Sequence, residues 1–513
     1  MNFLKNIFRK RSKVVVRFAP SPTGELHIGG SRTALFNYLF ARHNGGKFLL
    51  RIEDTDRERL VPGSIERIKT ALKWLGMELD NEGKVMIQSE RVDIYKKRAI
   101  ELLEKKEAYI CVCSKEKLTA DQEEQMKMGR PPMYSGHCRE AGIKISEVDP
   151  VRNHARASAP EGPLGQAISN GVEGIKPYVI RMKMPKSGKI IVRDLIRGDV
   201  EFDQSLIDDQ VLLKSDGYPT YHLANVIDDR EMKISHVIRA EEWLPSTPKH
   251  LILYKMFGWE APKFAHLPMI LAPDKSKLSK RHGATGVFEY KQLGYLPEAI
   301  INFIGLLGWH PKEDKDILNL NELINEFSLE RVQKGGAIFD VKKLNWLNSE
   351  YIKKAPVSEL KKSLADIFGH DFISAKGGSV SDGKNNDFMD KLIDLSRDRM
   401  EKLTDFKEIN EFFFNLPNYE KQLLVWKKSS LEQAVQNLKS VLEKILEINE
   451  SDFNKAKLES VLMPLANEIG RGEALWPLRV SLSGKDKSPG PFDIMDVLGK
   501  KETIRRIEIA IKK

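Results

Sequence analysis

Two segments of the sequence, about 250 residues apart, carry residues that could bind a polyphosphate. The first is a turn rich in proline and glycine that holds His27, Gly29 and Gly30 before an apolar pattern of helical spacing. Unpaired N–H groups and the dipole at a helix N-terminus attract anions, and a histidine N–H in the same turn could reach a phosphate oxygen. The second segment, Lys277 to Arg281, has three cations in five residues. Either segment alone is common in proteins without nucleotides, but together they predict one nucleotide site.

A strand and a helix must hold the first turn. Val14 to Val16 form a β-branched run that is typical of a short buried strand. After the turn, Leu35, Tyr38 and Leu39 recur at helical spacing, and Ser31 is expected to cap the first helical turn. Proline and glycine between the two elements end the strand and let the backbone approach a ligand closely.

Both segments resemble signatures of one enzyme class. HIGG, which starts at His27, resembles the HIGH signature of class I aminoacyl-tRNA synthetases, and KLSKR, which starts at Lys277, resembles their KMSKS signature. Four longer phrases resemble bacterial glutamyl-tRNA synthetases: RFAPSPTGELHIGG, RIEDTDRER, LLKSDGYPTYHLANVIDD and VIRAEEWLPSTPKH. They occur in the order of that family, between about Val14 and Leu347. Glutaminyl-tRNA synthetases typically read PEPNG where this chain has PSPTG, from Pro20 to Gly24.

The resemblance implies a reaction in two steps. Glutamate is activated by ATP to glutamyl-adenylate and is then transferred to the 3′ end of tRNA, with Mg²⁺ on the phosphates. His27 and Lys280 are the implied catalytic residues, because negative charge grows on the phosphates in the first transition state. Charging of the tRNA for glutamine as well is an alternative that the sequence leaves open. The implied ATP-binding residues are His27, Gly29, Gly30, Glu242, Trp243, Lys277, Leu278, Ser279, Lys280 and Arg281.

Polar residues at predicted strand ends are candidates for holding the amino acid. Arg17 and Arg239 both end strands, and a guanidinium fork can bind a carboxylate through two hydrogen bonds. We expect Arg17 to bind the side-chain carboxylate of glutamate, although a structural ion pair is the alternative for it. Arg239 is expected on the other carboxylate or on the adenylate phosphate. The glutamate-binding set that the resemblance implies is Arg17, Ala19, Ser21, Glu53, Tyr221, Asn225 and Arg239.

The chain has three cysteines, at positions 111, 113 and 138, and their spacing is typical of a zinc knuckle. Some members of the family carry zinc here with Cys-x-Cys followed by Cys-x-His, but this chain has Glu140 where the histidine would stand. Three reduced thiols are the alternative. We expect one structural zinc ion on Cys111, Cys113 and Cys138, with Glu140, His137 and Tyr134 as the candidates for the fourth ligand.

Two other function classes compete with a synthetase. One is a non-tRNA adenylyl- or nucleotidyltransferase of the same superfamily, but such enzymes are usually shorter, and 232 residues follow Arg281 here. The other is a catalytically silent RNA-binding relative, against which the intact HIGG and KLSKR segments argue.

The composition is that of an ordinary soluble protein, with 41% hydrophobic and 30% charged residues. A formal net charge of +10 favours a polyanionic partner such as tRNA. No run approaches the length of about 20 apolar residues that a membrane helix needs, so we expect no membrane partner. A cytoplasmic location and a monomeric state are two further expectations.

The predicted fold class is α/β: a Rossmann-like parallel-sheet catalytic domain with an inserted α+β domain, followed by an all-α C-terminal half. At 513 residues the chain is too long for one core. The predicted boundaries are a basic extension at 1–12, the two catalytic halves at 13–110 and 206–285, the inserted domain for the tRNA acceptor end at 111–205, a helical stem-contact domain at 286–350, and helical anticodon-binding domains at 351–513.

Overall fold

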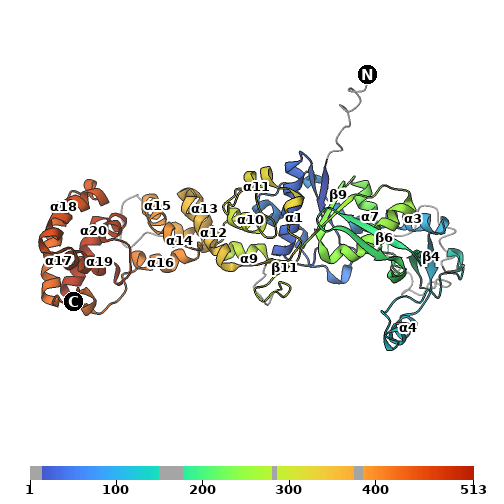
Figure 1. The fold of residues 1–513 in the computed structure, drawn as a ribbon. Coiled ribbons are helices and arrows are strands. Elements are labelled where there is room, and N and C mark those ends of the chain that lie inside the picture. Colours follow the sequence, from blue (N-terminus) through green and yellow to red (C-terminus); the bar gives the residue numbers. More distant parts are fainter. Residues whose placement is uncertain (1–13, 149–176, 280–285, 375–384) are drawn as a thin grey trace, which may run out of the picture. The chain divides into compact units, whose positions relative to one another are not determined.

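The computed structural model describes four ranges of the chain, residues 14–148, 177–279, 286–374 and 385–513. By their internal contacts these residues form two compact units (Figure 1). Unit 1 comprises Met1–Phe288 and Ile301–Asp340, and unit 2 comprises Glu289–Ile300 and Val341–Lys513. In the described ranges, no helix has the length and apolar composition that a membrane-spanning segment needs.

Unit 1 is built on parallel strands. The first three, β1 (Val15–Phe18), β2 (Lys47–Ile52) and β3 (Met86–Ile87), pair in parallel in that order. Most of β1 and β2 is buried, as expected for a sheet that helices cover on both faces. Helix α1 (Ile28–His43) makes the connection from β1 to β2, and its Leu35 and Leu39 are fully buried.

A second group of strands forms a separate sheet beside the first. Strand β10 (Lys263–Leu267) pairs in parallel with β9 (His236–Ala240) on one side and with β6 (Lys189–Asp194) on the other. Strand β9 lies beside β1: the N–H of Ser235, the residue before β9, donates to the Val15 carbonyl oxygen at 2.9 Å. The carboxyl ends of these parallel strands therefore meet at one edge, which is where open α/β sheets bind their ligands.

The predicted inserted domain and the second catalytic half share a sheet. Strands β6 and β7 (Gly198–Asp203) form an antiparallel pair within the predicted insertion, yet Asp194 of β6 pairs with Phe264 of β10. A further antiparallel sheet of β4 (Ala108–Cys111), β5 (Val179–Met182) and β8 (Val211–Leu213) joins the insertion to both catalytic halves, since β4 and β8 lie almost wholly outside the predicted range 111–205. Helix α4 (Lys115–Lys127) has no buried residue, and Figure 1 shows it projecting from this part of the unit.

The expected cap of the first helix is wrong. Helix α1 begins at Ile28, and the residue at its N-cap is His27, whose Nδ1 accepts a hydrogen bond from the Gly30 N–H at 3.3 Å. Ser31 lies inside the helix, and its hydroxyl donates back to the His27 carbonyl oxygen. The two glycines that read as turn residues are therefore the first turn of the helix, which starts about one turn earlier than predicted.

The remaining elements of unit 1 are helices and one small strand pair, and two of the helices, α9 and α10, have residues in both units. They are η1 (Arg57–Arg59), α2 (Ser64–Trp74), η2 (Glu82–Lys84), η3 (Gln88–Arg91), α3 (Val92–Glu104), α5 (Ile145–Val148), η5 (Gln204–Leu206), α7 (Tyr221–Glu231), η6 (Glu241–Ser246), α8 (Thr247–Phe257), β11 (Ile270–Leu271), α9 (Val287–Gln292), α10 (Pro297–Gly305), α11 (Leu320–Glu326), η8 (Leu329–Arg331) and β12 (Ala337–Ile338).

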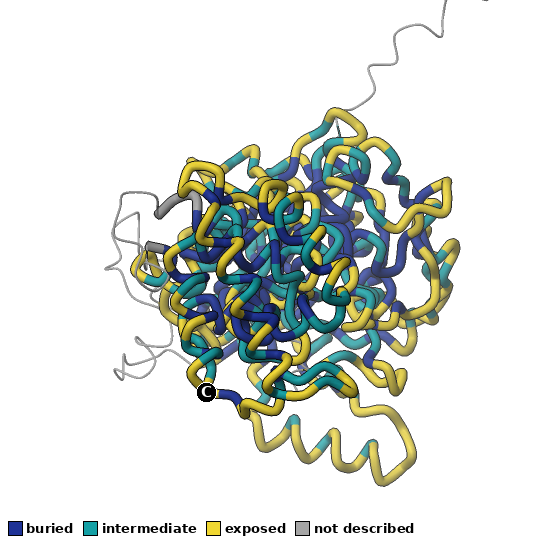
Figure 2. The backbone as a smooth tube through the Cα atoms, turned by 90° about the vertical axis from the view of Figure 1, so that its left-hand side faces the viewer, coloured by how far each residue is buried: buried dark blue, intermediate teal, exposed yellow. Residues whose placement is uncertain are grey.

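The regular elements in the described residues of unit 2 are all helices, as predicted. Leu438, Leu478 and Ile507 are fully buried in its core. Over the described chain as a whole, Figure 2 shows buried residues mostly inside and exposed residues mostly outside. The glycine- and serine-rich residues 377–387 predict a loop between helices, but this is wrong from Asn385 on, where α15 begins; residues 377–384 lie outside the described residues. The helices are α12 (Val341–Lys354), α13 (Val357–Phe368), α14 (His370–Ser374), α15 (Asn385–Ser396), η9 (Arg397–Arg399), α16 (Asp405–Phe414), η10 (Lys421–Leu424), α17 (Leu431–Leu446), η11 (Glu450–Asp452), α18 (Lys455–Ile469), α19 (Arg471–Ser483) and α20 (Pro491–Lys512).

Candidate active site

The turn between β1 and α1 opens the site. His27 is exposed at the helix N-terminus, while Gly29 and Gly30 form the first helical turn behind it. Ala19 and Ser21 follow β1 directly, and the Glu53 N–H donates to the Pro20 carbonyl oxygen at 3.0 Å. The backbone after β1 is thus tied to the end of β2, which keeps the turn next to the helix N-terminus.

The second sequence segment approaches the same turn. Lys280 and Arg281 lie outside the described residues, but Gly286 forms an isolated bridge with His27, and the Val287 N–H donates to the Leu26 carbonyl oxygen at 2.8 Å. The chain therefore returns to the HIGG turn just after the KLSKR segment.

The described part of the KLSKR segment is held by neighbouring elements. Lys277 is exposed and pairs with Glu242 at 2.7 Å, and the Leu278 N–H donates to the Ile270 carbonyl oxygen at 3.0 Å. Ser279 is exposed. The first contact links the segment to η6, which begins directly at the carboxyl end of β9, and the second links it to β11.

Arg239 is a buried cation whose partners are all neutral. Only 5% of it is exposed. Its guanidinium donates to the Tyr221 hydroxyl at 2.7 Å, to the Thr247 hydroxyl at 2.9 Å and to Nε2 of His266 at 3.1 Å. In the described part of the chain no carboxylate lies within ion-pair distance of it. A buried charge without a counter-ion is costly, and an anionic ligand would relieve that cost.

Two aromatic residues, Tyr221 and Trp243, lie beside Arg239. The Tyr221 ring packs against the Trp243 ring with 4.4 Å between centroids, and 38% of Trp243 is exposed. Burial raises the pKa of Tyr221, whereas the Arg239 and Arg17 guanidinium groups lower it, so both cations act on the same hydroxyl.

Arg17 lies in a second buried cluster, and its own carboxylate partner is Asp229. Nε of Arg17 donates to Asp229 at 3.0 Å, and Nη2 donates to the Asn225 side-chain oxygen at 3.3 Å. Arg51, which is fully buried, donates to Asp229 at 2.5 Å and to Glu53 at 2.9 Å. Nη1 of Arg17 donates to no described residue. Arg17 therefore has a structural ion pair and still has N–H groups available for a ligand.

The two carboxylates of this cluster have different environments. The pKa of Asp229 is lowered: burial raises it, but the charges of Arg17 and Arg51 outweigh that effect. The pKa of Glu53 is raised, because burial outweighs the charges of Arg51 and Arg17. Glu53 is thus a carboxylate for which a cationic ligand group would be a favourable partner.

Two neutral histidines, His222 and His250, form a hydrogen-bonded pair beside Arg239. Nδ1 of His222 and Nε2 of His250 are 3.0 Å apart, and Nδ1 of His250 is 3.4 Å from Nη1 of Arg239. Burial, with nearby Lys249 and Arg239, lowers the pKa of His222 to about 3. Burial also holds the pKa of His250 well below its usual value. Both rings can therefore accept a hydrogen bond without adding charge beside Arg239.

The three cysteines come together as their spacing indicates. The Sγ atoms of Cys111, Cys113 and Cys138 lie within 4.8 Å of one another, and two of them, of Cys113 and Cys138, are 3.5 Å apart. Zinc held by thiolates at about 2.3 Å spaces its sulfurs by roughly 3.8 Å, so the cluster has a suitable size. The Tyr134 hydroxyl lies 3.4 Å from the Cys111 sulfur and 3.7 Å from the Cys113 sulfur.

The other two candidates for a fourth zinc ligand, Glu140 and His137, do not belong to the group of ligand atoms that lie within 4.8 Å of one another. Glu140 is largely exposed and pairs with Lys183 at 3.2 Å and with Arg139 at 3.5 Å. His137 is exposed. Of the three candidates, Tyr134 has its oxygen against the thiols.

Comparison with known proteins decides the family. Residues 13–346 match the family model of class I tRNA synthetases (E and Q), catalytic domain, and residues 357–511 match that of an anticodon binding domain. The chain belongs to the class I tRNA synthetases. It is similar to the glutamate–tRNA ligase 2 of Thermoanaerobacter pseudethanolicus, with 44% identity over 98% of both chains. A glutamate–tRNA ligase of Dehalococcoides mccartyi is 43% identical over 98% of this chain and 97% of its own.

A solved structure supports the same relation. The crystal structure of a glutamate tRNA ligase from Elizabethkingia meningosepticum, in complex with its amino acid, has a TM-score of 0.81 and 38% identity; the match covers 98% of this chain and 99% of that one. The Rossmann-like parallel sheet and the helical C-terminal half agree with this family. As a class I tRNA synthetase the chain is an aminoacyl-tRNA ligase, and ATP is its substrate.

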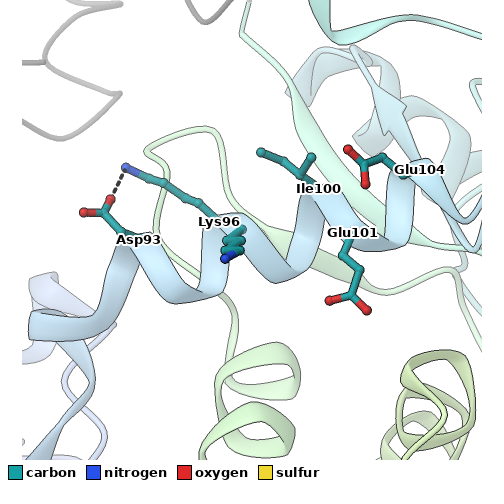
Figure 3. Close-up of a pocket in the computed structure, with 6 residues that line it drawn as sticks. Asp93, Lys96, Ile100, Glu101 and Glu104 are labelled. Carbon is teal, nitrogen blue, oxygen red and sulfur yellow. Dashed lines mark ion pairs between the residues drawn. The ribbon is translucent and has the colours of Figure 1, made fainter. Parts of the chain in front are cut away.

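A surface hollow elsewhere does not belong to the synthetase site. It has a volume of about 480 Å³, and Figure 3 shows its lining residues along one face of α3. They are polar except for Ile100, and an ion pair of 3.8 Å joins Asp93 to Lys96. A hollow lined by a single helix offers no converging groups of the kind that hold a small ligand.

A half-buried histidine, His236, predicts a loss of stability in mild acid. Burial, with nearby Lys263, lowers the pKa of His236 to about 4, so between about pH 6.5 and pH 4 the unfolded chain binds the proton more tightly. We therefore expect the melting temperature to fall as the pH is lowered from 7.5 to 5.5. His236→Gln should reduce this fall, whereas His310→Gln, at an exposed position, should leave it unchanged. Equal pH dependence in wild type and His236→Gln would contradict the assignment.

Proposed function

We propose that the chain is a glutamate–tRNA ligase, which couples the cleavage of ATP to AMP and pyrophosphate to the esterification of tRNA with L-glutamate. The observation that carries the proposal is the pair of buried arginines, Arg17 and Arg239, which are linked through Asn225 and His250. Two guanidinium groups suit an amino acid with an acidic side chain, since each can bind a carboxylate.

Glutamate is held by groups from three strand ends. The sequence predicted Arg17 alone for its side-chain carboxylate. We now place that carboxylate between Nη1 of Arg17 and the Arg239 guanidinium, whose described partners are all neutral. Its ammonium group faces Glu53, whose carboxylate gains from a cationic partner. Tyr221 and Asn225 complete the set, with Ala19 and Ser21 supplying the backbone edge next to the turn.

ATP lies across the HIGG turn and the KLSKR segment. The N–H groups at the start of α1, together with His27, face the phosphates, and Lys280 and Arg281 contribute charge from the other side. Trp243 and Glu242 stand beside the nucleotide. A magnesium ion on the phosphates, when bound, neutralises part of their charge.

The chemistry needs positioning more than proton transfer. The α-carboxylate of glutamate attacks the α-phosphorus of ATP, and the bond to pyrophosphate breaks, leaving glutamyl-adenylate. The terminal ribose hydroxyl of tRNA then attacks the activated carbonyl carbon, its proton is lost, and AMP leaves. Negative charge grows on the phosphate oxygens in the first step, so His27 and Lys280 stabilise that transition state more than the ground state.

Charging assays with purified tRNAs test the proposal and its alternative. We expect labelled glutamate to be attached to the tRNA for glutamate and labelled glutamine to be rejected. Attachment of glutamate to the tRNA for glutamine as well would identify the non-discriminating form. No attachment of glutamate to either tRNA would contradict the proposed function.

We propose one structural zinc ion on Cys111, Cys113 and Cys138, with the Tyr134 oxygen as fourth ligand. Elemental analysis of protein purified without chelator should find about one zinc per chain. Cys111→Ser and Tyr134→Phe should both lower this content, whereas Glu140→Gln, at an exposed ion-paired position, should not. Wild-type protein without zinc would contradict the site, and zinc loss in Glu140→Gln alone would move the fourth ligand there.

The predicted domain boundaries, the cytoplasmic location and the monomeric state remain our proposals. Size-exclusion chromatography with light scattering should give a mass near 58.5 kDa, that of one chain. A mass twice as large would contradict the monomer.

A further inference from the structure

Behind Arg239, two buried side chains form a hydrogen-bonded row that leads away from the ligand side. Nε of Arg239 is 3.1 Å from Nε2 of His266, and Nδ1 of His266 is 2.6 Å from Oδ2 of Asp194. The side chains of His266 and Asp194 have no exposed surface. The row joins the ends of three neighbouring strands, since Asp194 ends β6, His266 lies in β10 and Arg239 lies in β9.

The other oxygen of Asp194 is fixed by the backbone. Oδ1 accepts hydrogen bonds from the N–H groups of Ile196 at 3.0 Å, Arg197 at 2.9 Å and His266 at 3.3 Å. Burial raises the pKa of Asp194, but the hydrogen bonds from His266 and the backbone lower it overall, so the group is a carboxylate at neutral pH. A carboxylate can only accept hydrogen bonds, so the proton of the neutral His266 ring must be on Nδ1. Nε2 then has the lone pair that Nε–H of Arg239 needs.

We propose that Asp194 and His266 are a positioning pair for Arg239: Asp194 fixes the tautomer of His266, which orients the guanidinium toward the glutamate carboxylate without neutralising it. The inference rests on the proposed function and adds two residues to the glutamate site. Neither of them touches the ligand.

The imidazole between the two charges is what makes the arrangement useful. A carboxylate directly against Arg239 would compete with the ligand carboxylate for the same N–H groups, as Asp229 does for those of Arg17. With a neutral ring interposed, Arg239 is held at Nε, while its two terminal nitrogens face Tyr221, His250, Thr247 and the Trp243 carbonyl oxygen. The contacts to His250 at 3.4 Å and to Trp243 at 3.2 Å are long, and a ligand carboxylate can replace them.

Asp194→Asn tests the tautomer, because it changes one oxygen to NH₂ at nearly constant shape. The asparagine oxygen can keep the backbone bonds, while its NH₂ group donates to Nδ1 of His266. The ring proton then moves to Nε2 and faces another N–H, that of Arg239. We expect the KM for glutamate to rise about 10- to 100-fold, as when one hydrogen bond to a charged group is lost. The KM for ATP and the Kd for tRNA should each change less than about 3-fold.

A double-mutant comparison separates this role from a merely structural one. Lysine has no N–H at the position of Nε in arginine, so in an Arg239→Lys background the further change Asp194→Asn should alter the KM for glutamate by less than about 3-fold. If Asp194→Asn does not fold, His266→Gln and His266→Leu replace it. The glutamine amide can donate to Asp194 and accept from Arg239, so it should keep a KM for glutamate at least about 10-fold lower than that of the leucine variant.

Three outcomes would overturn the positioning role: an unchanged KM for glutamate in Asp194→Asn, an equal rise of the KM values for glutamate and ATP, or the same effect in the Arg239→Lys background. Equal KM values for glutamate in the two His266 variants would do so as well. Each of these results requires a wild type that activates glutamate. A wild type that does not do so contradicts the proposed function itself, so the two failures are distinguishable.

Discussion

Arg239→Ala is expected to lower kcat/KM for glutamate by about 10³-fold or more and to remove the preference for glutamate over glutamine. Glutamine has an NH₂ group where glutamate has a charged oxygen, so it cannot pair fully with a guanidinium fork. Poor pairing of a buried charge costs several kcal/mol, on the order of 10³-fold in specificity. Without Arg239 that penalty against glutamine disappears, and the gain for glutamate disappears with it. Removal of Arg239 leaves no buried carboxylate without a partner, because Asp194 still accepts hydrogen bonds from His266 and from the backbone.

Steady-state charging of tRNA with each amino acid measures this effect, and Arg17→Ala is the informative comparison. Arg17 has Asp229 as a structural partner, so its removal should lower the melting temperature as well as the preference for glutamate. Arg239→Ala with kcat/KM near that of the wild type would contradict the glutamate site. Full selectivity for glutamate in Arg17→Ala, with only a lower melting temperature, would show that Arg17 serves as a structural ion-pair partner of Asp229 and does not bind glutamate.

Lys280→Ala should slow the formation of glutamyl-adenylate by about 10²-fold or more while leaving tRNA affinity unchanged. Charge builds on the transferred phosphate oxygens in that step, and loss of one positioned cation removes stabilisation from the transition state. Lys280 lies outside the described residues, but Gly286 and Val287 bring the chain back to the HIGG turn just after it. Single-turnover activation measured with tRNA present gives the rate directly.

Lys263→Ala is a matched control for that variant. Lys263 is exposed at the amino end of β10, whereas the site lies at the carboxyl ends of the strands, so its removal changes net charge equally without touching ATP. We expect its activation rate to equal that of the wild type. Equal rates in Lys280→Ala and the wild type would contradict the role of the KLSKR segment.

Local sequence patterns predicted the parts of the site that lie within single segments. The run from Val14 to His43 contains strand, turn and helix, so proline, glycine and apolar spacing suffice to predict it. The three cysteines were found by spacing because Cys111 and Cys138 flank one short segment. The cap was misassigned because serine usually outranks histidine as an N-cap, whereas here the His27 ring accepts from Gly30.

The residues that pair with the two site arginines, or that orient them, could not be predicted from local sequence patterns. Arg17 and Asp229 are 212 residues apart in the chain, and Asp194 and His266 are 72 apart, so only the sheet order brings them together. Arg51 was also missed, since an arginine in an apolar strand gives no sign of which carboxylates will surround it. The consecutive acids Asp228 and Asp229 in an otherwise buried helix were an available signal, because buried carboxylates require cationic or hydrogen-bonding partners.

Transfer of labelled glutamate to bulk tRNA, with and without periodate oxidation of its 3′ ribose, tests the proposed reaction most directly. Oxidation destroys the terminal ribose hydroxyls that would attack glutamyl-adenylate, so we predict ATP-dependent labelling of native tRNA and none of oxidised tRNA. The label should also be released by mild alkali, as expected for an ester. Absence of label on native tRNA, or equal labelling of both tRNAs, would contradict a glutamate–tRNA ligase.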